Sequence, residues 1–173
     1  DKWPSFEAYI EALRERVAAA RDLLTADGCM FVHVDPTASH YVKVMMDGVF
    51  GRACFASEIV WRYRRWPVAG NNFQRMHDVL FRYVREADAE PRWNQLYELR
   101  SQSTIEKWGA AKQMVKMVDG KRVATSSEED SLGCPMGDVW DDIGIIAPPG
   151  LERTGYPTQK PERLLERIIL ACS

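Results

Sequence analysis

Residues 152–161, Glu-Arg-Thr-Gly-Tyr-Pro-Thr-Gln-Lys-Pro, lead directly into an apolar-faced segment, and this junction indicates how the chain folds. Pro161 suits the first turn of a helix, because the N–H that proline lacks would have no partner there. The residues that follow at helical spacing and predict this helix are Leu164, Leu165, Ile168 and Ile169. The turn before the helix can direct free backbone N–H groups and the Lys160 ammonium at an anion. A plain helix-start turn explains the same residues.

The composition is that of a globular protein, because 46% of the 173 residues are hydrophobic and 28% are charged. No apolar run approaches the length of a membrane span and no signal-peptide pattern is present, so we expect a cytoplasmic protein. The four cysteines lack metal-ligand spacing and are expected to be reduced thiols; no metal site is predicted. The chain begins without methionine and stops in a periodic segment, which suggests a fragment of a longer protein.

The first third of the chain alternates helix, strand and helix, as in an α/β layered domain. Residues 5–24 carry apolar side chains at steps of three and four and predict an amphipathic helix. Residues 29–34 form a nearly continuous apolar run, typical of a strand buried on both faces of a parallel sheet. A second helix should follow Pro36 and end at Gly51. Its inner face is predicted to contain Tyr41, Val44, Met45 and Val49.

Two polar residues of this region admit a functional and a structural interpretation. Asp35 follows a strand, where many α/β enzymes place catalytic groups, but an Asp-Pro pair before a helix is typical of an N-cap, which we favour. His33 lies within the strand and is expected to be buried and hydrogen-bonded, because no ligand partners accompany it.

Two further strands are predicted by period-two alternation at 59–63 and 79–83, and a long loop joins them. The segment 62–75 holds four arginines and no acid, although the whole chain has a net charge of −2. Arginines bind phosphates, aromatic rings stack on bases, and side-chain amides read base edges. The residues that would contact DNA are Arg62, Arg64, Arg65, Trp66, Asn71, Asn72 and Arg75. A solvated loop with two core aromatics is the alternative.

The stretch from 88 to 137 has a weaker pattern and is interpreted as an insert in the main domain. Residues 105–118 are predicted to form a helix, Asp119-Gly120 a turn, and the acidic stretch 126–130 an exposed segment.

Several of these segments together resemble the amino-methylating DNA methyltransferases, specifically the adenine-N6 type with the permuted β-class motif order. The resemblance rests on the segments 28–41, 50–51, 58–66, 73–78, 138–140 and 152–161. It implies a partial Rossmann-like domain that uses S-adenosylmethionine, built from residues 1–87 and 138–173, with a target-recognition insert at 88–137. The family's catalytic Asp-Pro-Pro-Tyr and glycine-rich Asp-Pro-Phe motifs are missing from this sequence, so no catalytic residue is assigned.

The resemblance also implies which residues would bind the cofactor. The segment 156–160 would form one wall of the S-adenosylmethionine pocket. The residues assigned to that pocket are Tyr156, Pro157, Thr158, Gln159, Lys160 and Asp138. The arginine-rich loop would face double-stranded DNA near an extruded adenine.

The functional expectation is therefore part of a prokaryotic DNA adenine-N6 methyltransferase of the restriction-modification type, inactive as this segment alone. A non-enzymatic DNA-binding or assembly subunit with a degenerate methyltransferase fold is the alternative. Whether a restriction subunit accompanies the protein, and whether the chain forms oligomers, is left open by the sequence.

Overall fold

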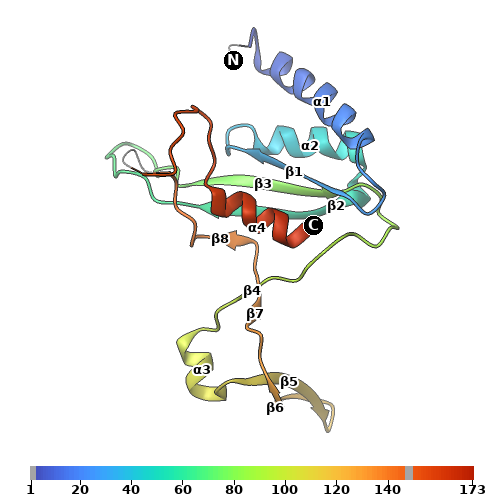
Figure 1. The fold of residues 1–173 in the computed structure, drawn as a ribbon, viewed down its shortest axis with the longest axis vertical. Coiled ribbons are helices and arrows are strands. Elements are labelled where there is room, and N and C mark those ends of the chain that lie inside the picture. The colour runs from blue at the N-terminus through green and yellow to red at the C-terminus, as the bar shows by residue number, and fades with distance from the viewer. Residues whose placement is uncertain (1–2, 147–149) are drawn as a thin grey trace. The chain divides into compact units, whose positions relative to one another are not determined.

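The computed structural model describes residues 3–146 and 150–173. Residues 1, 2 and 147–149, which fall within the predicted methyltransferase segments, lie outside that description. The chain divides into two compact units, one containing residues up to Asn94 together with Asp138–Ser173, the other Gln95–Gly137. The elements of the larger unit are α1 (Phe6–Asp22), β1 (Cys29–Val34), α2 (Ser39–Phe50), the 3-10 helix η1 (Arg52–Cys54), β2 (Phe55–Arg62), β3 (His77–Val84), β8 (Val139–Trp140) and α4 (Glu162–Cys172) (Figure 1).

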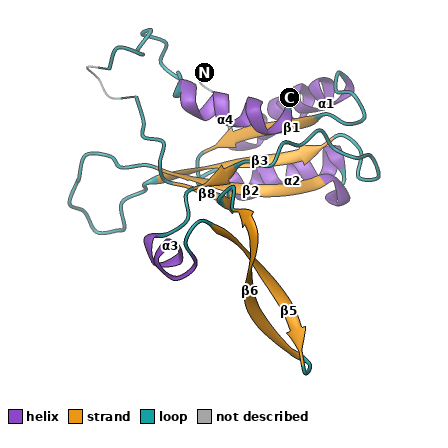
Figure 2. Cartoon of the chain, turned by 60° about the horizontal axis from the view of Figure 1, so that its bottom comes forward, coloured by secondary structure: helices purple, strands orange, loops and turns teal. Residues whose placement is uncertain are grey.

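The predicted parallel sheet is wrong, because β1, β2 and β3 form an antiparallel sheet. The strand order is β1-β3-β2-β8; β3 pairs antiparallel with β1 and β2, and only the two-residue β8 runs parallel to β2. The apolar run of β1 has another cause. One face of β1 packs against α1 and α2, and its other face lies on the side of the sheet that holds α4 (Figure 2).

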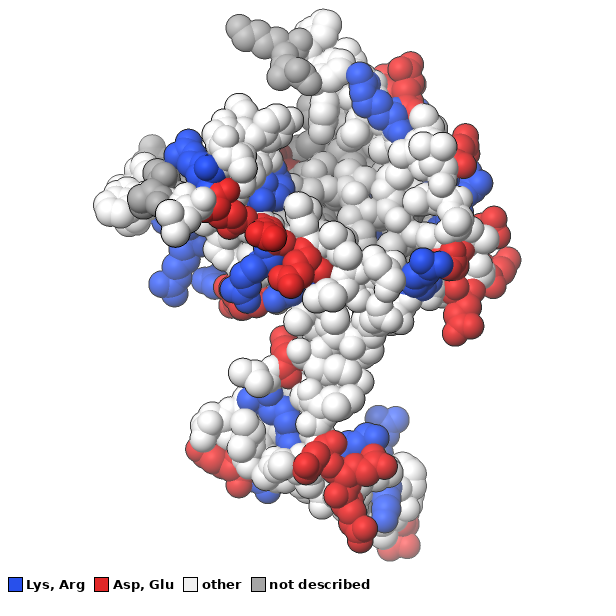
Figure 3. Space-filling model, in the orientation of Figure 1, with Lys and Arg blue, Asp and Glu red and all other residues white. Residues whose placement is uncertain are grey.

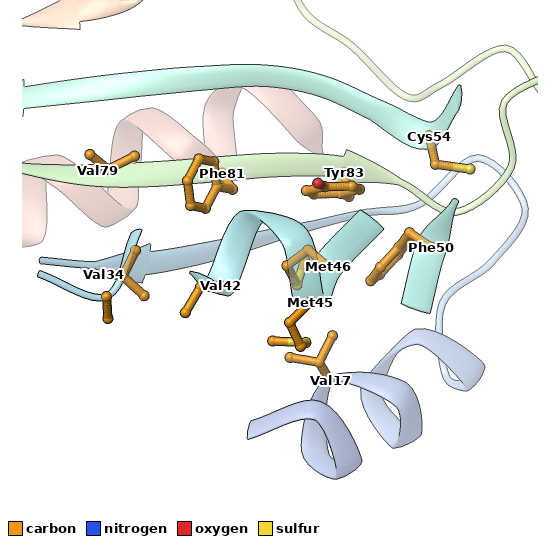
Figure 4. Packing of buried hydrophobic residues seen from close by; sticks show 11 residues of the cluster. Val17, Val34, Val42, Met45, Met46, Phe50, Cys54, Val79, Phe81 and Tyr83 are labelled. Atoms are coloured by element: carbon orange, nitrogen blue, oxygen red, sulfur yellow. The ribbon is translucent and has the colours of Figure 1, made fainter. Parts of the chain in front are cut away.

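The main core lies between the sheet and the first two helices (Figure 4). Helix α1 begins where Ser5 Oγ accepts the N–H of Ala8 (3.2 Å), and α2 ends at Gly51, whose φ of 89° favours glycine. Both helices agree with the prediction. Side chains from α2, β1 and β3 meet in the core; these include Val34, Val42, Met45, Met46, Phe50, Val79, Phe81 and Tyr83.

The predicted inner face of α2 is wrong in two of its four residues. Tyr41 is 60% exposed and Val44 is 71% exposed, whereas Met46 is completely buried. Apolar residues surround most of this helix, so its periodicity alone does not fix its rotation. Packing against β3 selects the face that contains Val42 and Met46.

The smaller unit contains a β-hairpin instead of the predicted helix at 105–118. Its elements are β4 (Tyr97–Glu98), α3 (Gln102–Trp108), β5 (Ala111–Val118), β6 (Lys121–Asp130) and β7 (Cys134–Pro135); β5 pairs antiparallel with β6, and β4 with β7. Helix α3 stops at Gly109, whose φ is 60°. Residues 111–118 pair with residues 121–130 across the Asp119-Gly120 turn, which confirms the turn and the exposure of most of 126–130.

Within residues 3–146 and 150–173 no helix has the length and apolar character needed to cross a membrane. The same residues contain no cluster of His, Cys, Asp and Glu side chains suited to a metal ion.

Candidate functional site

The polar residues of the larger unit gather at one edge of its sheet. Strands β1, β2 and β8 end at this edge and β3 begins there, because β3 is antiparallel to β1 and β2 while β8 is parallel to β2. The 63–76 loop leaves from the end of β2, and the segment after β8 leads from the same edge to α4 (Figure 1). The backbone bond from Tyr63 N–H to Met76 O (2.9 Å) closes the base of the 63–76 loop.

Asp78 is the centre of a hydrogen-bond network at this edge. Its Oδ1 accepts the hydroxyl of Tyr63 (2.9 Å), and its Oδ2 lies 3.0 Å from Nε2 of His33. A carboxylate only accepts, so Nε2 of His33 carries the proton in this contact. The guanidinium of Arg65 in turn donates to the Tyr63 oxygen (3.1 Å). Residues from β1, β3 and the 63–76 loop are thereby joined.

Burial keeps the two partners of Asp78 neutral near pH 7. Desolvation is the largest cause that lowers the pKa of His33, and the positive charge of Lys160 lowers it further, against the opposing effect of Asp78. Desolvation, followed by the hydrogen bond to Asp78, raises the pKa of Tyr63. Asp78 is therefore the acceptor of two uncharged donors.

A cavity of about 200 Å³ lies beside the network. Its lining comes from β2, β3 and the two loops, and consists of Trp61, Tyr63, Arg65, Asp78, Ile145, Ile146, Gln159, Lys160 and Pro161. Trp61 is held by a hydrogen bond from its Nε1 to the carbonyl of Ile143 (2.8 Å). The cavity thus combines an apolar wall with two cations.

Gln159 organises the 152–161 loop. Its Oε1 accepts the N–H (2.8 Å) and the hydroxyl (2.9 Å) of Thr154, while its Nε2 donates to the carbonyl of Glu152 (2.8 Å). Gly155, with φ of 84°, lets the chain turn inside this span. The amide of Gln159 is therefore occupied by its own loop.

The start of α4 differs from the expectation in three respects. Pro161 is the N-cap residue, with ψ of 136°, and Glu162 is the first helical residue. The carboxylate of Glu152 accepts the N–H of Glu162, so the chain supplies its own anion there. Lys160, whose ammonium we expected to be directed at an anion, is half-buried at the cavity and donates to Thr158 O (2.8 Å).

Of the six predicted cofactor residues, the structure brings two to the cavity. Gln159 and Lys160 line it, whereas Tyr156, Pro157 and Thr158 are exposed in the loop that precedes them. Asp138 is exposed at the opposite end of β8, where its carbonyl accepts the N–H of Val60 (2.8 Å).

The predicted DNA-contacting residues are exposed and divide into two groups. Arg62, Arg64, Arg65 and Trp66 line an open groove of about 740 Å³, together with Tyr63, Asp141, Gly144 and Ile145. Asn71, Asn72 and Arg75 lie further along the loop, where Arg75 contacts Asp35 Oδ2 (3.3 Å) and Thr37 Oγ1 (2.9 Å).

Two aromatic rings of this loop extend into solvent. Trp66 is 86% exposed and Phe73 is fully exposed, so neither is the core aromatic of the alternative interpretation. Elsewhere, basic and acidic side chains are interspersed on the face shown in Figure 3. The loop has positive charge without acid in its own sequence, but in the fold Asp141 pairs with Arg62 and Asp35 pairs with Arg75.

Asp35 has a structural role and not a catalytic one, but the prediction that it is the N-cap of α2 is wrong, because the N-cap residue is Ala38. The Oδ1 of Asp35 accepts the N–H groups of Thr37 (2.9 Å) and Ala38 (3.3 Å), which holds the turn before α2. Helix α2 begins three residues after Pro36, at Ser39.

The geometry agrees with the comparison to known proteins. The family model for DNA methylases matches residues 1–173, the whole of the chain. The chain belongs to the DNA methylase family. One curated relative, the type II methyltransferase M.EcaI of Enterobacter cloacae, is 31% identical over 79 residues, which are 45% of this chain. The match spans 18% of the length of that methyltransferase.

Sequence reasoning about this methylase missed Asp78 as the centre of the site. The sequence feature that could have indicated it is the carboxylate of Asp78 in a strand of alternating residues. In the structure Asp78 is paired with Trp61 of β2. Only the antiparallel pairing of β3 with both β1 and β2 brings Asp78 between His33 and Tyr63.

Proposed function

We propose that the chain is a segment of a DNA methyltransferase that transfers a methyl group from S-adenosylmethionine to N6 of adenine in a restriction-modification system. The observation that carries the proposal is the meeting of the arginine-rich loop and the 152–161 loop at one cavity, through Arg65 and Lys160. Membership of the DNA methylase family supports the reaction class. The choice of adenine N6 over cytosine N4 rests on the motif resemblance alone.

The residues at the cavity fit one end of S-adenosylmethionine, the methyl donor that DNA methylases typically use. The ammonium of Lys160, half-buried, would hold the carboxylate of its methionine part. The cavity of about 200 Å³ is smaller than the roughly 300–1,000 Å³ of typical ligand sites. We therefore assign only part of the cofactor site to this chain, with Tyr156 and the neighbouring exposed loop as its outer wall.

The open groove beside the cavity would bind the DNA. Arg62 and Arg64 would neutralise phosphates, and the exposed ring of Trp66 offers a stacking surface for a base extruded from the duplex. Of these two arginines, Arg62 pairs with Asp141 at 3.6 Å. Arg64 has no ion-pair partner among residues 3–146 and 150–173, so we expect it to contribute more to DNA affinity.

The reaction is tested with the complete product of the gene. It is incubated with labelled S-adenosylmethionine and duplex DNA, and the DNA is hydrolysed to nucleosides. We expect the label in N6-methyladenine. Label in N4-methylcytosine would contradict the adenine assignment, and unlabelled DNA would favour the non-enzymatic subunit. The 173-residue chain alone should give no label, and turnover by it would contradict the expected inactivity of the segment.

The DNA surface is tested by the salt dependence of binding. We expect Arg64→Ala to weaken binding and to lower the slope of log K against log salt by about 1, because one phosphate contact is lost. Arg16→Ala, on exposed α1, is the matched control and should leave the slope unchanged. Equal slopes for the parent and Arg64→Ala would contradict the placement of DNA in this groove.

A further inference from the structure

A second set of reactive groups lies on the face of the sheet that holds α4, away from the Asp78 network. Cys29 of β1 and Cys172 of α4 both line a cavity of about 300 Å³, together with Gly28, Phe31, Arg92 and Ile168. Both thiols are half-buried and neither forms a disulfide. No local pattern associates these two cysteines, which are far apart in the chain.

The end of α4 is fixed in place, which positions Cys172. Asn94 donates its backbone N–H to Ala171 O (2.8 Å), and its side-chain Nδ2 donates to Leu170 O (2.9 Å) and Ser173 O (2.8 Å). These bonds hold the carbonyls on both sides of Cys172. The thiol of Cys172 is thereby held beside the edge strand β1, at the cavity that Cys29 also lines.

The guanidinium of Arg82 provides an independent reason to expect an anion here. Arg82 is only 8% exposed, and its Nε and Nη2 are buried without a hydrogen-bond partner among the described residues. A buried cation with unpaired donors is strongly destabilising unless an anion accompanies it. The guanidinium of Arg82 lies 4.4 Å from the centre of the Trp93 ring. In the pairing of β3 with β1, Arg82 is opposite Phe31, which is two residues from Cys29.

Cys29 has the properties of that anion. The interaction with the Cys172 thiol, followed by the positive charge of Arg82, lowers the pKa of Cys29 to about 6, in spite of its burial. The interaction with Cys29 raises the pKa of Cys172, which therefore keeps its proton. The remaining charged groups at the cavity, Asp27 and Arg92, pair with each other (2.9 Å).

We propose that Cys29 and Cys172 form a peroxide-reactive thiol pair, with Cys29 as the attacking thiolate and Cys172 as the resolving thiol. The Cys29 sulfur attacks one oxygen of hydrogen peroxide, the O–O bond breaks, and hydroxide leaves, so that Cys29 becomes a sulfenic acid. The Cys172 sulfur then attacks Cys29, the S–O bond breaks, and the hydroxyl leaves as water with the proton of Cys172. Two thiols and one peroxide give one disulfide and two waters, and β1 is joined covalently to α4.

The first experiment measures the thiolate of Cys29 by its ultraviolet absorbance during a pH titration of the 173-residue chain. We expect a midpoint near 6. Cys172→Ala removes the neighbouring thiol and should move the midpoint toward the ordinary value of about 8.5. Cys134→Ala, in the smaller unit, is the matched control and should leave it unchanged. A parent midpoint at the ordinary value would overturn the proposal.

The second experiment treats the dilute, reduced chain with hydrogen peroxide and measures intact mass and cysteine-containing peptides. We expect a loss of two hydrogens and a peptide pair that joins Cys29 to Cys172. The Cys172→Ala variant has no resolving thiol, so Cys29 should gain oxygen in it and should not form a disulfide. Oxidation of Cys54 or Cys134 ahead of Cys29, or a disulfide between two copies of the chain, would overturn the proposal. A circular dichroism spectrum of each variant confirms that it is folded.

Discussion

Replacement of Asp78 by alanine is expected to lower the free energy of unfolding by about 2–4 kcal/mol, and the value follows from the two partners of this residue. The hydroxyl of Tyr63, which is 3% exposed, loses its only described acceptor and becomes a buried unpaired donor, at a cost of about 1–3 kcal/mol. His33 loses its bond to Oδ2 but is partly open to water, so its share is about 1 kcal/mol. The loss is a large fraction of the roughly 5–15 kcal/mol that stabilises a typical domain.

The measurement is urea unfolding of the 173-residue chain, followed by far-ultraviolet circular dichroism. Asp78→Asn separates hydrogen bonding from other effects, because its amide oxygen still accepts from Tyr63; we expect it to retain at least half of the lost free energy. Asp88→Ala is the surface control, exposed and with an expected effect within about 0.5 kcal/mol. If Asp78→Ala matches Asp88→Ala, or if Asp78→Asn is as destabilised as Asp78→Ala, the network does not contribute as described.

Three further substitutions test other parts of the larger unit. His33→Gln should reduce the pH dependence of stability. The pKa of His33 in the folded state lies below its unfolded value of about 6.5, so the free energy of unfolding of the parent falls as the pH is lowered through about 6.5 and below. The free energy of unfolding of the variant should fall less over the same pH range. Met46→Ala should cost about 2–5 kcal/mol in urea unfolding, because this core side chain is completely buried. Tyr83→Phe should lower the free energy of unfolding by about 1.5 kcal/mol, because the Tyr83 hydroxyl donates a hydrogen bond to Asp47 Oδ1 (2.6 Å). Desolvation, followed by the hydrogen bond to Asp47, raises the pKa of this hydroxyl, so it stays protonated and able to donate.

Two of these substitutions have a control variant on the same element or of the same residue type, and His33→Gln is compared with the parent. Val44→Ala, on the exposed side of α2, should change the unfolding free energy far less than Met46→Ala. Tyr41→Phe, at an exposed position, is the control for Tyr83→Phe. A parent and a His33→Gln variant with parallel pH profiles between about pH 7.5 and about pH 5 would show that His33 is not buried as a neutral group.

Local signals in the sequence were sufficient for the individual elements of the larger unit. The caps at Ser5 and Gly51 and the alternation of Ile59, Trp61 and Tyr63 act within a few residues, so α1, the end of α2 and β2 were predicted correctly. Residues 111–118 were not, because apolar residues at helical spacing matched a helix, whereas pairing with residues 121–130 across the Asp119-Gly120 turn makes the segment a strand.

The pairing of the strands and the assembly of the site depend on contacts that no local pattern specifies. A continuous apolar run such as 29–34 arises whenever both faces are covered, and it does not distinguish parallel from antiparallel neighbours. Asp78 is 45 residues from His33 and 15 from Tyr63, and only the register of β3 brings them together. The arginine-rich loop was found from composition, because most of its residues are exposed and its charge is visible in the sequence itself.

The carboxylate of Glu152 at the start of α4 makes the chain an intramolecular competitor for its own anion site. It is tethered ten residues from the N–H that it accepts, so its effective concentration there is of millimolar order. An external anion, a cofactor carboxylate included, can accept that N–H only if it displaces Glu152. The alternative is that the anion leaves Glu152 in place and binds beside it, to Lys160. Occupancy of this helix end is therefore governed by an exchange between two carboxylates, and the charge on Glu152 sets the concentration at which an external anion replaces it.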